Sequence, residues 1–155
     1  MNPAIALDSI EDLVLHRNPM LLVQSVVDWN ETGAEVLVDT NDSRLFADGQ
    51  GNIPAWVGIE YMAQAIAAYA GIVSKLNNEP LRLGFLLGTR RYSANISFFL
   101  PNQQLRVCVK ELLRDENNLV LFDCYIFSGE ELLARAELKA IQPPNLDNIL
   151  AQFKK

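Results

Sequence analysis

One carboxylate stands out because of the residues around it. Glu60 is the only acidic residue between Asp48 and Lys75, in a stretch that is otherwise uncharged. A carboxylate in an apolar helix costs free energy unless it is paired or neutral, so such groups often take part in proton transfer. A structural Glu that bonds to a nearby group is the alternative. Gln64 follows one helical turn later and could orient the carboxyl group.

His16 is the second candidate, because it is the only histidine of the chain. Histidine is the side chain that most often serves as a general base near neutral pH. It stands in the segment His16-Arg-Asn-Pro19, where a structural turn residue is the alternative.

Other kinds of chemistry find little support in the sequence. Cys108 and Cys124 lie in strand-like runs without an adjacent base, so we expect reduced core residues and not nucleophiles. One histidine and two distant cysteines do not have the spacing of a zinc site. Nucleotide-binding and serine-hydrolase motifs are missing. Asp48 reads as a surface turn residue. We therefore expect no metal and no cofactor held by the protein itself.

Length and charge limit the function further. A chain of 155 residues predicts one domain over 1–155, with a tail from about 143, and the net charge of -6 argues against nucleic-acid binding. The first residues lack a basic signal region, which predicts a cytoplasmic protein. The segment 54–74 is long enough to span a bilayer but carries Glu60 and Gln64 and lacks a positive flank. We expect a buried central helix and no membrane insertion.

The N-terminal half predicts four kinds of element. Caps, turn residues and apolar runs indicate them. In chain order we expect a short helix over Asp8–Val14 capped by Asp8 or Ser9, a strand over Met20–Trp29, a hairpin turn at Asn30–Gly33, a strand over Ala34–Thr40, a polar loop over Asn41–Asn52 and a helix from Pro54 to Ser74.

The C-terminal half predicts an antiparallel meander. Apolar and polar residues alternate with a period of two, and turn residues separate the runs. We expect strands at about 82–99, 105–113, 119–128 and 132–141, and a short tail helix over Leu146–Phe153. A helix as apolar as the central one must be wrapped by the sheet. The predicted class is therefore α+β, with the layout of a hot-dog fold.

Four segments carry a family resemblance. They are Leu15-His-Arg-Asn-Pro-Met-Leu-Leu-Val-Gln24, the stretch from Pro54 to Gln64, Gly84-Phe-Leu-Leu-Gly88 and Phe99-Leu-Pro-Asn-Gln-Gln-Leu105. In this order they resemble the 3-hydroxyacyl-acyl-carrier-protein dehydratases of the hot-dog fold. The sequence around Glu60 is most similar to a branch of the family associated with aryl polyene synthesis. The resemblance implies fatty-acid or polyene-type biosynthesis and a substrate on the phosphopantetheine arm of an acyl carrier protein.

The resemblance also implies roles for single residues. Glu60 corresponds to the family's helix acid, and Gln64 would orient it. The N–H groups of Trp56 and Val57 would polarise the thioester carbonyl, and Gly88 would contact the substrate. In such proteins the site forms between two subunits, which predicts a homodimer, a higher oligomer or a hetero-oligomer with a paralogue.

The chain departs from the family at one position. The catalytic histidine of the family lies in a Gly-His-Phe-Pro segment, and Phe46 stands in its place here. Either His16 has taken over the role, or the site works without a histidine, or the protein is not a dehydratase. We expect the first. His16 would then abstract the α proton, and Glu60, held protonated by burial, would donate to the departing hydroxyl.

Two other functions stay open. A hot-dog thioesterase would use Glu60 to activate water, and a non-catalytic subunit would shape the tunnel of an active paralogue. Arg90 and Arg91, with Arg44, are candidates for docking an acidic carrier protein, against a plain solvated strand face. The depth of an acyl tunnel would depend on which aromatic and aliphatic side chains line it, the candidates being Tyr61, Ile66, Tyr69, Phe85 and Phe98.

Overall fold

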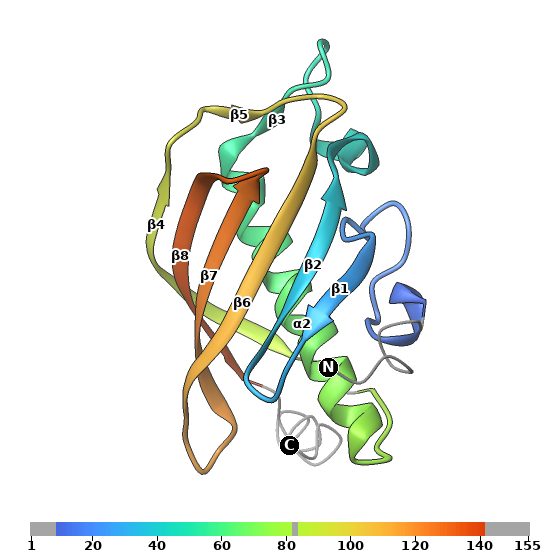
Figure 1. Ribbon diagram of the computed structural model, residues 1–155, viewed down its shortest axis with the longest axis vertical. Helices are drawn as coiled ribbons and strands as arrows, with labels where there is room; N and C mark the ends of the chain where they lie inside the picture. Colours follow the sequence, from blue (N-terminus) through green and yellow to red (C-terminus); the bar gives the residue numbers. More distant parts are fainter. Residues whose placement is uncertain (1–8, 82–83, 142–155) are drawn as a thin grey trace, which may run out of the picture.

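A single long helix crosses one face of an antiparallel sheet. The computed structural model describes residues 9–81 and 84–141. Helix α2 (Gly58–Leu76) packs against a six-stranded sheet, as Figure 1 shows. In spatial order the strands are β1 (Ser25–Trp29), β2 (Gly33–Asp39), β6 (Gln104–Arg114), β7 (Leu119–Ser128), β8 (Glu131–Ile141) and β4 (Phe85–Ala94). The predicted α+β class is confirmed.

The core lies between the sheet-facing side of α2 and the inner side of the strands. Fully buried residues recur every three or four positions along α2, and in the first half of β6 every second residue is buried, as the period of two predicts. By length and composition the stretch Ala55–Leu76 could cross a membrane, but 67% of its apolar window is buried inside the protein. It is the core helix of this fold. The buried side chains include Tyr61, Met62, Ala65, Ile72, Val36, Val38, Leu105, Val107 and Ile126.

The predicted strand 82–99 is two strands, and its pairing differs from a simple meander. β4 pairs with β8 at the far edge of the sheet, and the two-residue strand β5 (Phe98–Phe99) pairs with β3 (Ile53–Pro54). The break follows Ala94, where the N–H of Asn95 donates to the carbonyl of Leu133. That bond still ties the backbone to β8, and the chain leaves β8 only after Asn95, before β5 begins.

The central helix begins later than predicted. Pro54 lies in β3, a short 3-10 helix η3 (Ala55–Val57) follows, and α2 proper begins at Gly58. The Tyr92 hydroxyl donates to the Ala55 carbonyl just before the helix. A Cβ atom on Gly58 would lie 2.3 Å from the Tyr92 hydroxyl oxygen, so only glycine fits at this start.

Two other predictions for the N-terminal half need correction. The first helix is a 3-10 helix, η1 (Ile10–Asp12), whose cap is Ser9, as predicted, because its hydroxyl accepts from the Glu11 N–H. The predicted loop 41–52 begins with a 3-10 helix, η2 (Thr40–Phe46). Its Ser43 is fully buried and shares a hydrogen bond of 2.6 Å with the Tyr61 hydroxyl. The predicted Asp8 cap and the tail helix 146–153 lie outside the described residues.

Strand β1 is shorter than the apolar run that predicts it. Leu21, Leu22 and Val23 are buried, yet the strand begins only at Ser25. The Leu22 N–H donates to the side-chain oxygen of Gln64 on α2, at 2.8 Å, and not to a neighbouring strand. The run is therefore tied to the helix, since its backbone finds a partner there.

Gly71 lets the N-terminal segment lie directly on α2. A Cβ atom at this position would lie 2.0 Å from the Leu13 carbonyl oxygen and within 3 Å of two further Leu13 backbone atoms. Backbone atoms cannot rotate away as a side chain can. The absence of a side chain at Gly71 therefore fixes how closely the segment that carries His16 approaches the helix.

Replacing Gly71 with alanine should destabilise the protein by about 2 kcal/mol or more, because the added methyl group overpacks a backbone contact. Urea unfolding measures the change. Gly49→Ala is the matched control, since nothing lies within 4 Å of its added Cβ. Equal stability of the two variants would contradict this account of the contact.

The buried Tyr61 predicts a loss of stability in alkali. Burial raises the pKa of Tyr61 to about 12, against an ordinary value near 10. The unfolded chain then loses the proton first, so the unfolding free energy falls as the pH rises above about 10. Tyr61→Phe should show a shallower decline. It should also cost about 1–3 kcal/mol at neutral pH, because the buried Ser43 hydroxyl loses its partner.

Urea unfolding at a series of pH values between neutral and about pH 11 separates the two effects. Wild type and the phenylalanine variant are compared at each pH. Parallel declines would show that Tyr61 does not titrate with the expected shift.

Candidate active site

A cavity of about 600 Å³ runs along α2, and its other walls come from the N-terminal segment and from strands of the sheet. Its helical wall includes Glu60 and residues one, two and three turns later, namely Ala63, Ala67 and Ala70. The segment Leu13–His16 forms the wall across from the start of the helix. The two candidates for proton transfer therefore line the same cavity.

His16 and Glu60 face one another across that cavity. The distance from His16 Nε2 to Glu60 Oε1 is 3.9 Å, and the two side chains are 34% and 37% exposed. This separation is too long for a hydrogen bond, so neither group blocks the other. Both can reach a small group placed beside them. His16 Nδ1 is buried and has no hydrogen-bond partner among the described residues.

Gln64 holds the carboxyl group of Glu60 in place. Its amide nitrogen donates to Glu60 Oε1 at 2.9 Å and to the Met20 carbonyl at 2.8 Å, while its oxygen accepts from Leu22. Gln64 is fully buried and uses both ends of its amide. The contact predicted from the one-turn spacing is present, and it also anchors the chain that follows His16.

The expected burial of Glu60 is wrong for this chain. The side chain is 37% exposed because it lies on the cavity side of α2 and not on the sheet side. The carboxylate is accommodated by Gln64 and by the open cavity. Its apolar sequence neighbours mostly face the sheet, so the lack of charge around it does not mean that it is enclosed.

The residues predicted to bind the thioester lie elsewhere. Trp56 is 60% exposed in η3, Val57 is fully buried, and Gly88 lies on β4 with open space around its Cα. None of the three lines the cavity that His16 and Glu60 share. Phe46, at the position of the family histidine, packs edge-on against Trp56 with ring centroids 5.8 Å apart.

The other candidate residues for docking and catalysis lie outside the cavity. Arg90 and Arg91 are exposed on β4, and Arg44 is exposed at the end of η2. Burial raises the pKa of Cys108 to about 12, which does not suit a nucleophile. Asp48 is a surface turn residue whose carboxylate accepts from the N–H groups of Gln50 and Asn52.

The candidates for the tunnel lining separate into two groups. Ile66 and Tyr69 line the cavity, whereas Tyr61 is buried in the core and Phe98 is 45% exposed on β5. The side chain of Phe85 lies outside the description.

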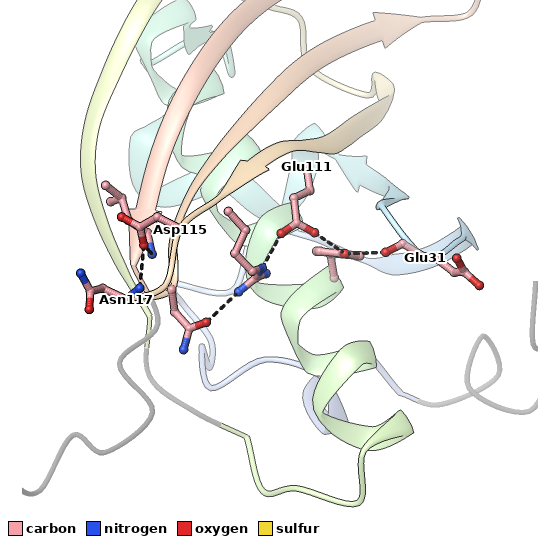
Figure 2. A network of polar contacts seen from close by, with 8 residues as sticks. Glu31, Glu111, Asp115 and Asn117 are labelled. Carbon is pink, nitrogen blue, oxygen red and sulfur yellow. Dashed lines mark hydrogen bonds and ion pairs between the residues drawn. The ribbon is translucent and has the colours of Figure 1, made fainter.

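Sequence reasoning missed a polar cluster at the other end of the cavity. Glu111 Oε2 accepts from the Tyr69 hydroxyl at 3.1 Å, and Glu111 Oε1 accepts from Arg114 Nε at 2.5 Å. Figure 2 shows these contacts between α2 and the end of β6. The only signal in the sequence was an acid and an arginine at the edge of a strand, and that pattern is also typical of a solvated face.

Most of the chain matches a known protein family. The family model of the ApeP-like proteins, described as ApeP dehydratase, matches residues 8–151. This chain belongs to the ApeP-like dehydratase family. A search of curated proteins finds no match to the sequence. The resemblance to hot-dog dehydratases stated from the sequence motifs is confirmed.

Solved structures agree with the family. A chain of the dehydratase heterocomplex ApeI:P from Xenorhabdus doucetiae is 26% identical, with a TM-score of 0.85 over 93% of this chain and 97% of that one. Two more distant structures share the fold. Cj0977, a virulence protein of Campylobacter jejuni, is 13% identical with a TM-score of 0.58, covering 87% of this chain and 88% of its own.

The other is a Streptococcus pneumoniae protein described as a hypothetical thioesterase and solved with coenzyme A. It is 12% identical with a TM-score of 0.57, covering 76% of this chain and 86% of its own. The fold is therefore a hot-dog fold, in which the curled sheet encloses the central helix.

Gln64→Leu should lower the unfolding free energy by about 3 kcal/mol, because it leaves the buried Leu22 N–H and Met20 carbonyl without partners. Urea unfolding provides the measurement. Gln24→Leu makes the same chemical change at an exposed side chain and should cost little. Similar losses in both variants would mean that the Gln64 amide does not anchor the segment.

Proposed function

We propose that this protein dehydrates a 3-hydroxyacyl thioester on an acyl carrier protein to the trans-2-enoyl thioester, in fatty-acid or polyene-type biosynthesis. The observation that carries the proposal is the pair His16 and Glu60, 3.9 Å apart on one cavity. The α and β carbons of the substrate are directly bonded. A base for one and an acid for the other must therefore lie this close together.

The proton transfers balance within the pair. His16 takes the proton from the α carbon, the electrons of that C–H bond form the double bond, and the C–O bond to the β carbon breaks. Glu60 gives its proton to the departing hydroxyl, which leaves as water. The site resets when the proton on His16 returns to Glu60, directly or through a water molecule. Gln64 keeps the carboxyl group aimed at the histidine throughout.

The remaining roles follow the resemblance. The N–H groups of Trp56 and Val57, at the turn before α2, would hold the thioester oxygen, and Gly88 would contact the substrate, where the substrate extends beyond the cavity of the single chain, since none of the three lines that cavity. The exposed Arg90 and Arg91 on β4 would attract an acidic carrier protein. The reaction needs no cofactor held by the protein, since the phosphopantetheine arm belongs to the carrier protein. A cytoplasmic location fits such a partner.

We also propose that the working form is an oligomer, with a paralogue as the partner. The structure at 26% identity comes from a dehydratase heterocomplex. In this chain, Leu15 beside His16 is 49% exposed, and Trp56 one turn before Glu60 is 60% exposed. Large apolar side chains exposed around a candidate site are typical of an interface. A second subunit there would also offer an acceptor to the unpartnered His16 Nδ1.

Replacing either member of the pair should lower the rate of dehydration at least about a hundredfold, the usual contribution of an acid or base. The variants are His16→Ala and Glu60→Gln. Mass spectrometry of a 3-hydroxyacyl carrier protein measures the loss of one water. Glu116→Gln, on an exposed turn, is the matched control for the carboxylate. Each protein is assayed alone and after mixing with the paralogous subunit.

The outcomes separate the functions that the sequence leaves open. Loss of water that depends on both residues supports the proposed mechanism. An active His16→Ala variant would contradict the role of the histidine. A chain that is inert alone, and whose two variants leave the activity of the mixture unchanged, would be a non-catalytic subunit. Release of free thiol would indicate a thioesterase.

A further inference from the structure

The cavity has two chemically different ends. His16 and Glu60 occupy one end, and the middle is apolar, with Ile66 and the alanines of α2 along the wall. The other end is polar. It is formed where the β6–β7 hairpin passes α2, and the residues that line it there are Glu31, Tyr69, Glu111, Arg114 and Asn118.

These polar residues form one connected network, which Figure 2 shows. The single O–H of Tyr69 is shared between two acceptors, the Glu31 carbonyl at 2.9 Å and Glu111 Oε2 at 3.1 Å. Arg114 bonds to Glu111 through Nε and to Asn118 Oδ1 through a terminal nitrogen at 3.3 Å. The Tyr69 ring packs edge-on against Phe122, so the hydroxyl is held rigidly at the cavity wall.

The network still has acceptor capacity to offer. A carboxylate has about four lone-pair positions, and the contacts of Glu111 with Tyr69 and Arg114 use one on each oxygen. The Glu111 carboxylate lines this end of the cavity beside Arg114, whereas Glu31 joins the network through its backbone carbonyl and its side chain points away from the network (Figure 2). The environment at this end of the cavity favours an uncharged hydrogen-bond donor. It disfavours an anion, because like charges repel, and an alkyl group, which displaces water without replacing its hydrogen bonds.

The distance between the two ends suits one extended ligand. Tyr69 is nine residues after Glu60, and an α-helix rises about 1.5 Å per residue, so the two lie about 13 Å apart along the axis. An acyl chain of medium length with its reacting carbons at Glu60 would place its tail at Glu111. The apolar middle of the cavity would contact the methylene groups between.

We propose that Tyr69, Glu111 and Arg114 select the far end of the acyl chain, favouring tails that end in an uncharged hydrogen-bond donor such as a hydroxyl. Tails that end in a methyl group or a carboxylate are disfavoured. This assignment rests on the proposed function for the position of the reacting end. The cluster is a specificity determinant and takes no part in the proton transfers.

A binding experiment tests the assignment without requiring turnover. The probes are three decanoyl pantetheine amides, which are alike except that the tail ends in a methyl, a hydroxyl or a carboxylate group. Titration calorimetry measures their dissociation constants with wild type, Glu111→Gln and the control Glu116→Gln. Wild type should bind the hydroxyl probe about tenfold more tightly than the methyl probe, and the carboxylate probe most weakly.

The Glu111→Gln variant gives the sharper result. It removes the repelling charge and leaves Arg114 without its carboxylate partner, so the carboxylate probe should now bind at least about tenfold more tightly than it does to wild type. A merely structural role for Glu111 would instead weaken all three probes alike. Tyr69→Phe keeps the ring on Phe122 and should reduce the preference for the hydroxyl probe.

Different results would refute the proposed tail selection and the proposed dehydration reaction. Equal binding of the three probes to wild type, or no binding of any, would overturn the tail selection. A parallel weakening in Glu111→Gln would do the same. A chain that shows the tail preference but removes no water from a 3-hydroxyacyl carrier protein would keep the assignment and refute the dehydratase mechanism.

Discussion

A single buried amide joins the main parts of the candidate site. Gln64 bonds to the backbone at Met20 and Leu22 on one side and to the Glu60 carboxyl group on the other. An unmatched buried amide costs free energy, so these three partners stay together or separate together. The late start of β1, the course of the segment after His16 and the direction of Glu60 all depend on this residue. Folding and preorganisation of the site are thereby one event.

Helix α2 serves two different environments with its two sides. The side with Tyr61, Met62 and Ile72 is fully buried against the sheet, and the side with Glu60 and the alanines faces the cavity. The sheet side carries the apolar area that stabilises the fold. The cavity side is free to hold a carboxylate, because little of the core depends on it. Gly71 extends this division by letting the Leu13 backbone lie on the helix.

The parts of the fold that the sequence predicted are those set by local periodicity and composition. The central helix, the β2 strand and the strands β6, β7 and β8 follow from such patterns. The errors arose where a distant side chain decides the backbone, as Gln64 does for residues 20–22 and Tyr92 does near Gly58. The pairing of β4 with β8 depends on closure of the whole sheet, which no local pattern encodes.

The candidate site, like the fold, was only partly predictable from the sequence. Glu60, His16 and Gln64 were found because their types are unusual for their positions, and the structure brings them together. The exposure of Glu60 was missed, since the charge pattern of a helix does not tell which side meets a cavity. The cluster at Glu111 was missed because its residues come from three separate segments. Each of them looks ordinary among its sequence neighbours.

The alanines along the cavity wall have a consequence for the size of the cavity. Ala63, Ala67 and Ala70 are each half-buried and border the open space between the two polar ends. A larger side chain at any of them would shorten or divide that space while the sheet side of the helix kept its packing. Single substitutions at these three positions would therefore change the size of the cavity at little cost to the core. The size of the cavity and the stability of the fold are therefore partly independent, because these three alanines are less buried than the core residues that also line the cavity.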